Sequence, residues 1–302
     1  MGRKDGYRLK DQSPFYEMIP NIMPERSDAT NLFEQDVDFE IIQDIESALE
    51  IAGMTIEELA NELNVTRATV SNWLNERVSI SDRHLDAFYS YVYRKGIRLN
   101  RIKEQFYRED MINRNEVLLF HGAKTMIEGE LSLGHNKKIN DFGNGFYCGE
   151  SLEQSVMFVA TYPNSSLYML KFNPTGLKKK EYKVDREWML TIAYHRNSLD
   201  KYTNNKLIRK IADANKGIDY IVAPIADNRM FEIIDSFIDG EITDVQCQHC
   251  LSATNLGMQY VFISERAFSN ITMLERCYLS EDEKNAYLSA RQKSFSMNQD
   301  KV

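Results

Sequence analysis

The stretch from Leu118 to Gly149 constrains this chain more than any other part of it. It begins with an apolar run that ends on His121-Gly122 and, about twenty residues later, reaches the segment NDFGNGFYCG. The apolar run predicts a buried strand that places a histidine at its end, where Gly122 lets the backbone turn freely. The later segment predicts a glycine-rich loop that leads into Phe146-Tyr147. Two such loops facing one another would form a cleft in which a histidine and a tyrosine meet a ligand.

Simpler interpretations exist for each part of this stretch. A lone histidine after a strand is more often structural than ligand-binding, and a Phe-Tyr pair is more often packing. The glycine spacing also suggests the dinucleotide fingerprint Gly-x-Gly-x-x-Gly. However, Cys148 stands where the third glycine should follow Gly143 and Gly145, and no helix-forming run opens within the loop. The sequence therefore argues against a Rossmann-type site.

The bulk composition is that of a soluble globular protein. The chain has 302 residues, which is enough for two domains, with 43% hydrophobic and 27% charged residues. Its longest apolar runs are far shorter than the roughly 18 residues that a membrane helix requires. The charged N-terminal residues lack the apolar segment of a secretory signal. We therefore expect a cytoplasmic protein without membrane contact.

Charge and cysteine content exclude further classes. The net charge of −8 gives no general attraction to nucleic acid or to anionic membranes, so any DNA contact has to be local. Four cysteines do not make a disulfide scaffold at this length. The segment Cys247-Gln248-His249-Cys250 could supply two or three zinc ligands, but a structural zinc site needs four. We expect reduced thiols and no bound metal.

Between Phe39 and Tyr107 the pattern is helical. Apolar residues recur at helical spacing up to Ala52, and Gly53 follows as a natural C-terminal cap. The segment Thr55-x-x-Glu58 has the form of a capping box and predicts the start of a short helix. A further apolar and aromatic stretch from Leu85 to Tyr107 predicts a helix that completes the small domain and continues as a link.

Two short helices joined by a tight turn are expected within this region. Asn64 can adopt the left-handed conformation of the turn, and Thr66 can cap a second helix over 67–74. The segment TIEELANELNVTRATVSNWLNE (55–76) resembles the helix-turn-helix of phage repressors. In that motif the start of the second helix reaches base edges in the major groove. The resemblance implies that the DNA-contacting residues are Arg67, Thr69, Ser71 and Asn72.

The charge of this region argues in the opposite direction. Between residues 40 and 80 there are eight acidic residues and only two arginines. Phosphate neutralisation supplies most non-specific DNA affinity. Use of the motif for dimer or partner contacts is therefore an open alternative. A basic flank could still come from downstream residues, namely Arg83, Arg94, Lys95, Arg98, Arg101 and Lys103.

The rest of the chain predicts an α+β domain rather than a βαβ repeat, because short strands are interspersed with separate helices. We expect helices over 152–160, 188–194 and 207–214, and strands over 167–172, 220–223 and 259–263. From Ser280 the chain is polar, without an evident contribution to the core.

Several segments of this part carry a family resemblance. FHG (120–122) followed by GNGFY (143–147) resembles segments of ADP-ribosyltransferases of the diphtheria-toxin and poly(ADP-ribose) polymerase type. The longer segment NDFGNGFYCGESLEQSVMFVA (140–160) is similar to a bacterial domain-of-unknown-function family, number 3990, linked to that fold. Three further segments fit the same family in order: REWMLTIAYHRN (186–197), DYIVAPIADNRMFEII (219–234) and MQYVFISERAFSNI (258–271).

The resemblance implies a domain division and a split-sheet fold. The parts are an N-terminal arm (1–38), a helix-turn-helix domain with its linking helix (39–107), an ADP-ribosyltransferase-like α+β domain (111–275) and a polar C-terminal tail (276–302). It also implies NAD as co-substrate. The implied NAD-binding residues are His121, Gly122, Gly145, Phe146, Tyr147 and Asp227, and the implied catalytic residues are Gln259, Tyr147, His121 and Asp141.

One departure affects the expected chemistry. The resemblance assigns His121 to the adenosine-side ribose and Tyr147 to stacking on the nicotinamide ring. Related enzymes place a glutamate at the start of a later strand, and its counterpart here is Gln259, whose amide carries no negative charge. Asp141 could supply the missing carboxylate, or it could cap its loop. Asp227 could do the same, or it could pair with Arg229.

Three functions are therefore expected as alternatives. The first is an NAD-dependent mono-ADP-ribosyltransferase with a DNA-binding or targeting helix-turn-helix, of which a toxin or phage-defence effector is one form. The second is a transcriptional regulator that senses NAD or ADP-ribose without turnover, and the third is an interaction protein with a degenerate site. The expected partners are NAD, DNA, an unidentified acceptor macromolecule and, as an open possibility, a second copy of the chain.

Overall fold

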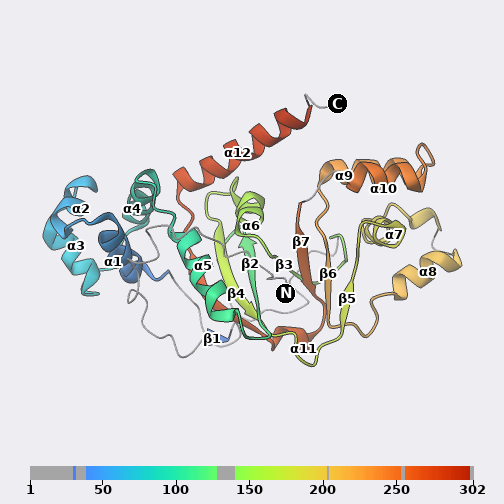
Figure 1. Ribbon diagram of the computed structural model, residues 1–302, viewed down its shortest axis with the longest axis horizontal. Helices are drawn as coiled ribbons and strands as arrows, with labels where there is room; N and C mark the ends of the chain where they lie inside the picture. The colour runs from blue at the N-terminus through green and yellow to red at the C-terminus, as the bar shows by residue number, and fades with distance from the viewer. Residues whose placement is uncertain (1–29, 32–38, 128–139, 203, 253–255, 300–302) are drawn as a thin grey trace, which may run out of the picture.

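The N-terminal part is a bundle of short helices at one end of the molecule (Figure 1). A computed structural model describes residues 30–31, 39–127, 140–202, 204–252 and 256–299, and most of the arm expected over 1–38 lies outside them. The bundle consists of α1 (Ile41–Ala52), α2 (Ile56–Glu62), α3 (Arg67–Leu74) and α4 (Asp82–Arg94). Its core contains Ile45, Leu59, Val70 and Phe88, all almost fully buried.

The turns of this bundle follow from local sequence signals, which confirms those predictions. The Thr55 hydroxyl accepts a hydrogen bond from the backbone N–H of Glu58, whose carboxylate in turn accepts from the N–H of Thr55. Asn64 takes the left-handed conformation, with φ of 54°. The hydroxyl of Thr66 accepts from the N–H of Thr69 at 3.1 Å and caps α3.

The expected continuous helix from Leu85 to Tyr107 is wrong. The structure divides this stretch into α4 and α5 (Leu99–Met111), with Gly96 between them at φ of 88°. Such a backbone conformation favours glycine and ends a helix. The break lets α5 turn away from the bundle and pack on the sheet.

A twisted sheet forms the body of the second part. Its described strands are β1 (Thr30–Asn31), β2 (Val117–Ala123), β3 (Phe146–Gly149), β4 (Ser166–Phe172), β5 (Lys179–Glu181), β6 (Tyr220–Pro224), β7 (Met258–Phe262) and β8 (Ile271–Cys277). They lie in the order β1-β8-β4-β2-β3-β7-β6-β5, and every neighbouring pair is antiparallel except β5 with β6. This mixed architecture after a helical region confirms the expected fold class at that level.

Two groups of helices cover one face of the sheet. The helices α5 and α6 (Leu152–Val159) pack over β2 and β4, with Phe120, Val156 and Met169 between them. The second group packs over β6 and β7 and comprises α7 (Arg186–His195), α8 (Lys206–Asp213), α9 (Asn228–Ile238) and α10 (Asp244–Ser252), while a short 3-10 helix covers Asp200–Tyr202. The opposite face is aromatic, and α11 (Glu265–Phe268) packs on it.

The expected turn at His121-Gly122 is wrong. Strand β2 continues to Ala123 and pairs with β4 over its whole length. Gly122 is required for another reason, because a Cβ there would lie 2.4 Å from the carbonyl oxygen of Ser155 on α6. The glycine therefore allows close packing of a helix on the strand.

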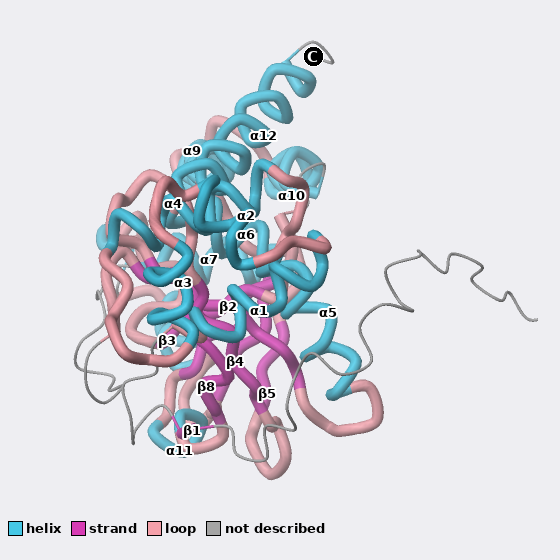
Figure 2. Tube along the Cα trace, turned by 90° about the vertical axis from the view of Figure 1, so that its left-hand side faces the viewer, coloured by secondary structure: helices cyan, strands magenta, loops and turns pink. Residues whose placement is uncertain are grey.

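The chain after Ser280 also differs from the expectation. It forms α12 (Glu281–Gln299), which projects from the body in Figures 1 and 2. At its start Leu279, Glu283 and Lys284 are buried, and the Nζ of Lys284 donates to the carbonyl of Pro163 at 2.8 Å. Polar residues contribute to the core here because each finds a partner from another part of the chain.

A buried ion cluster joins the helical bundle to the sheet. The Nζ of Lys103 on α5 lies 2.5 Å from Asp44 of α1 and also contacts Glu275 of β8. The hydroxyl of Tyr89 donates to Asp44 at 2.6 Å, and that of Tyr107 donates to Glu275 at 3.2 Å. Burial alone would lower the pKa of Lys103, but the two carboxylates outweigh it and raise the pKa, so the lysine is charged.

Removing the lysine should leave two buried carboxylates without a cation. We expect Lys103→Met to reduce the free energy of unfolding by about 3–5 kcal/mol, the usual result of breaking a buried ion pair from one side. Urea denaturation of the full chain measures this. The matched control is Lys95→Met, because Lys95 is exposed. Equal losses in the two variants would contradict a structural role for the cluster.

Candidate functional site

Tyr147 of β3 holds the glycine-rich loop in place through hydrogen bonds. The Tyr147 hydroxyl accepts from the N–H of Phe142 at 3.1 Å and donates to the carbonyl of Gly143 at 2.8 Å. Burial raises the pKa of Tyr147, so the phenol is neutral. Tyr147 therefore fixes the loop that carries Asp141, whatever else its ring contacts.

Asp141 and Gln259 lie together beside this loop. The Nε2 of Gln259 donates to Asp141 at 3.4 Å and to the carbonyl of Pro224 at 3.2 Å. Gln259 is 7% exposed, on the strand β7 between Gly149 of β3 and Ala223 of β6. Because both partners of Nε2 are acceptors, the orientation of the amide is determined, and Oε1 has no partner among the described residues.

Arg196 holds the other side of Asp141. It follows α7, and its Nη1 lies 3.2 Å from the Oδ1 of Asp141. Its guanidinium also lies 3.5 Å from the ring centroid of Phe231 on α9. Burial raises the pKa of Asp141, while the bonds from Gln259 and Arg196 oppose that rise. We did not single out Arg196 from the sequence, although it lies in a segment that carries the family resemblance.

His121 bridges β2 and β3 where their pairing ends. The ladder between these strands contains the single pair Phe120 and Gly149. Just beyond it, the Nδ1 of His121 lies 2.7 Å from the carbonyl oxygen of Tyr147. Since a carbonyl only accepts, Nδ1 carries the hydrogen, and Nε2 is the acceptor in the neutral ring. Burial lowers the pKa of His121, and the bond to Tyr147 opposes this only in part.

The predicted site residues thus fall into two groups. Tyr147 and Gln259 lie on the face of the sheet that α7 and α9 cover, because the antiparallel register of β3 and β7 places both side chains on the same face. His121 instead stacks on Phe146, with ring centroids 4.3 Å apart, on the opposite, aromatic face. The structure brings Asp141 to the first group. The two groups lie on opposite faces of the sheet, near the point where the β2–β3 ladder stops.

Two further predicted binding residues have structural explanations. Gly145 passes so close to β7 that a Cβ would lie 2.7 Å from Val261. Asp227 caps α9, because its carboxylate accepts from the N–H of Met230 at 2.9 Å. The alternative expected for Asp227, an ion pair with Arg229, is not the contact it makes. Neither capping nor close packing requires a ligand.

The helix-turn-helix presents its second helix to solvent. Arg67 is exposed, and Thr69, Ser71 and Asn72 are partly exposed along α3. Part of the expected basic flank has partners within the chain, whereas Arg83 and Lys95 are exposed. Arg94 pairs with Asp282, Arg98 covers the ring of Tyr93, Arg101 pairs with Glu104, and Lys103 is buried.

In the described parts of the chain, no three residues of His, Cys, Asp and Glu are grouped to hold a metal ion. Cys247 is buried and Cys250 exposed on α10, and all four cysteines are free. No helix in these parts is long and apolar enough to cross a membrane.

The fold and these sites define a class of protein in which a helix-turn-helix bundle is mounted on an α+β sheet domain. The chain belongs to the family described as "Protein of unknown function (DUF3990)", which matches residues 117–273, more than half of its length. The family described as "Helix-turn-helix" matches residues 45–88. Both matches confirm the resemblances seen in the sequence at that level. No curated protein and no solved structure matches the chain.

The lowered pKa of the half-buried His121 should make stability depend on pH. A folded-state pKa below the usual 6.5 means that stability is fully present above pH 6.5 and is lost as pH falls through the folded pKa. We expect the melting temperature of the wild type to fall more steeply below pH 6.5 than that of His121→Gln. His249→Gln, at an exposed histidine, is the control and should follow the wild type. Parallel curves for all three proteins would contradict a lowered pKa of His121.

Proposed function

We propose that this protein binds DNA through α3. The observation that supports the proposal is the row of accessible polar side chains on a correctly capped second helix of the motif. In helix-turn-helix proteins that helix enters the major groove and its first residues contact base edges. An arginine can pair with guanine and an asparagine with adenine, so Arg67 and Asn72 are suited to direct readout.

The charges around the motif predict how the affinity for DNA should depend on salt. Six of the acidic residues between 40 and 80 lie on α1 and α2, and Arg94, Arg98, Arg101 and Lys103 have internal partners. Few cations remain to neutralise phosphates, so affinity has to rest mainly on base contacts. A weak dependence of affinity on salt follows, since the slope scales with the number of phosphates neutralised.

Selection from a random duplex pool with the full chain tests DNA binding. We expect one sequence class to be enriched, and Arg67→Ala and Asn72→Ala each to weaken binding to it by about 1–3 kcal/mol. Arg186→Ala, an exposed arginine on α7, is the matched control. A pool that shows no enrichment at low salt would favour a partner-binding role for the motif.

We also propose that residues 117–273 bind NAD and transfer its ADP-ribose to an acceptor. The observation that favours this second function is the pair formed by Asp141 and Gln259 beside Tyr147. The amide of Gln259 uses its Nε2 on Asp141 and Pro224, which leaves Oε1 to accept a hydrogen bond from a ribose hydroxyl. Asp141 accepts a hydrogen bond from the same amide. It therefore supplies, next to Gln259, the carboxylate that Gln259 itself lacks.

His121 fits the same ligand from the opposite face. Its Nε2 is an acceptor, as Oε1 of Gln259 is, and both suit sugar hydroxyls, which donate. A dinucleotide has two ribose rings, so one ligand lying across the edge where the β2–β3 ladder stops could meet both groups. Cleavage of the nicotinamide–ribose bond builds positive charge on the sugar, which a nearby carboxylate stabilises. Arg196 and the bonds to Tyr147 hold the residues that would do this in place.

Substitutions of Asp141 and Gln259, singly and together, test this second proposal. Gln259→Ala should reduce nicotinamide release by about 10²–10³, because one well-placed polar contact is lost. Gln259→Glu places a second carboxylate beside Asp141, so we expect it to lower the melting temperature. The double variant Asp141→Asn with Gln259→Glu restores an amide–carboxylate pair and should recover both stability and activity.

Intact-mass analysis and labelled NAD, with cell extract as the acceptor source, provide the readout for this series. Asp235→Asn, at an exposed residue of α9, is the control. If no variant and no extract gives nicotinamide release while calorimetry shows NAD binding, the domain senses NAD without turnover. If NAD does not bind either, the proposed site is wrong.

A further inference from the structure

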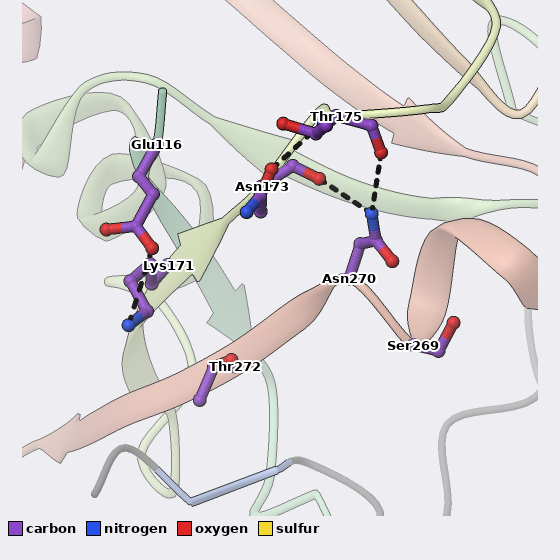
Figure 3. A pocket seen from close by; sticks show the side chains of 7 residues that line it. All are labelled: Glu116, Lys171, Asn173, Thr175, Ser269, Asn270 and Thr272. Atoms are coloured by element: carbon purple, nitrogen blue, oxygen red, sulfur yellow. Dashed lines mark hydrogen bonds and ion pairs between the residues drawn. The ribbon is translucent and has the colours of Figure 1, made fainter. Parts of the chain in front are cut away.

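A polar cavity of about 290 Å³ lies at the other end of β2 from His121 (Figure 3). It forms where three neighbouring strands begin or end: Glu116 precedes β2, Asn173 follows β4 and Asn270 precedes β8. Glu116 lies five positions before His121 along the chain, roughly 16 Å at about 3.3 Å per residue. The cavity is therefore distinct from the site assigned to NAD. Its lining residues are Glu116, Lys171, Asn173, Thr175, Ser269, Asn270 and Thr272.

The rim of this cavity is held by its own hydrogen bonds. The Nδ2 of Asn270 donates to the carbonyl of Asn173 at 2.8 Å, and the N–H of Thr175 donates to the Oδ1 of Asn173 at 3.0 Å. Asn173 and Asn270 also share a backbone bond of 3.0 Å. These bonds orient both amides, which leaves the Nδ2 of Asn173 as a donor and the Oδ1 of Asn270 as an acceptor. The cavity is thus pre-organised.

The charged pair of this cavity, Lys171 and Glu116, does not fill its hydrogen-bonding capacity. The Nζ of Lys171 lies 3.6 Å from the Oε1 of Glu116, which is too long for a hydrogen bond. The Oε2 of Glu116 is buried and has no hydrogen-bond partner among the described residues. Buried carboxylate oxygens are costly without a donor. A strong donor is therefore missing beside Glu116, and a strong acceptor can still be added beside Lys171.

The charges decide which ligand fits. Glu116 repels a simple anion and Lys171 repels a metal cation, so the ligand has no net charge. The described lining contains no aromatic ring for the apolar face of a sugar. We propose that this cavity binds a small zwitterion, an α-amino acid, with its ammonium on Glu116 and its carboxylate on Lys171. Asn173 and Thr272 then face the carboxylate and the polar part of the ligand.

Calorimetry of the full chain with a panel of free amino acids tests this proposal. Acetate, ethylamine and glucose are the comparison probes, because each lacks one or both charges. We expect saturable binding of at least one amino acid at up to about 10 mM, the range of weak sites, and no binding of the comparison probes. Lys171→Met and Glu116→Gln should each weaken it about tenfold or more, as expected for loss of a charge-assisted bond.

Two further variants test whether the loss of binding is specific to the cavity. Lys179→Met removes an exposed, paired lysine on β5 and should bind like the wild type. Thr272→Val keeps a β-branched shape, so it should fold even if the charge variants do not, and it should weaken binding measurably. The proposal is overturned if no amino acid binds, if a comparison probe binds equally well, or if the cavity variants that fold all bind like the wild type.

Discussion

A lysine buried between two carboxylates joins the two halves of this protein. Asp44 comes from α1, Lys103 from α5 and Glu275 from β8, so each member belongs to a different element. Charges inside a protein gain little net stability, but leaving any of them unpaired is costly. The cluster therefore penalises arrangements in which bundle and sheet separate. Stacking of Tyr89 on Tyr278, with centroids 4.7 Å apart, reinforces the same contact.

This attachment has consequences for DNA recognition. One cation of α5 that could have contributed to a basic surface instead binds the sheet domain, because Lys103 contacts Glu275. On the same helix, the amide of Asn100 donates to Glu283 of α12 at 3.0 Å. Cations that hold the two halves together are not available to phosphates. Under the proposed function, α3 would then recognise DNA with few phosphate contacts, while the sheet domain is held in a fixed position relative to the duplex.

The sequence predicted features that depend on neighbouring residues, and it missed those that depend on distant ones. The capping box at Thr55 and the left-handed Asn64 are local, and the structure has both. Gly122 was interpreted as a turn, because the sequence does not reveal that α6 packs against it. Likewise Arg196 reaches Asp141 across 55 positions of the chain, and no periodicity carries such a pairing. Of the candidate site, the residue types were predictable but their partners were not.

The partners matter because they determine which polar atoms face a ligand. Tyr147 binds the Nδ1 hydrogen of His121, and Asp141 with Pro224 binds the amide hydrogens of Gln259. Each residue is left with an acceptor, which under the proposed function would bind a donor such as a sugar hydroxyl. Two acceptors set the orientation at Gln259, because the carbonyl of Pro224 at 3.2 Å and the carboxylate of Asp141 at 3.4 Å both accept from Nε2. Together they fix which atom of the amide is left to accept a hydrogen bond.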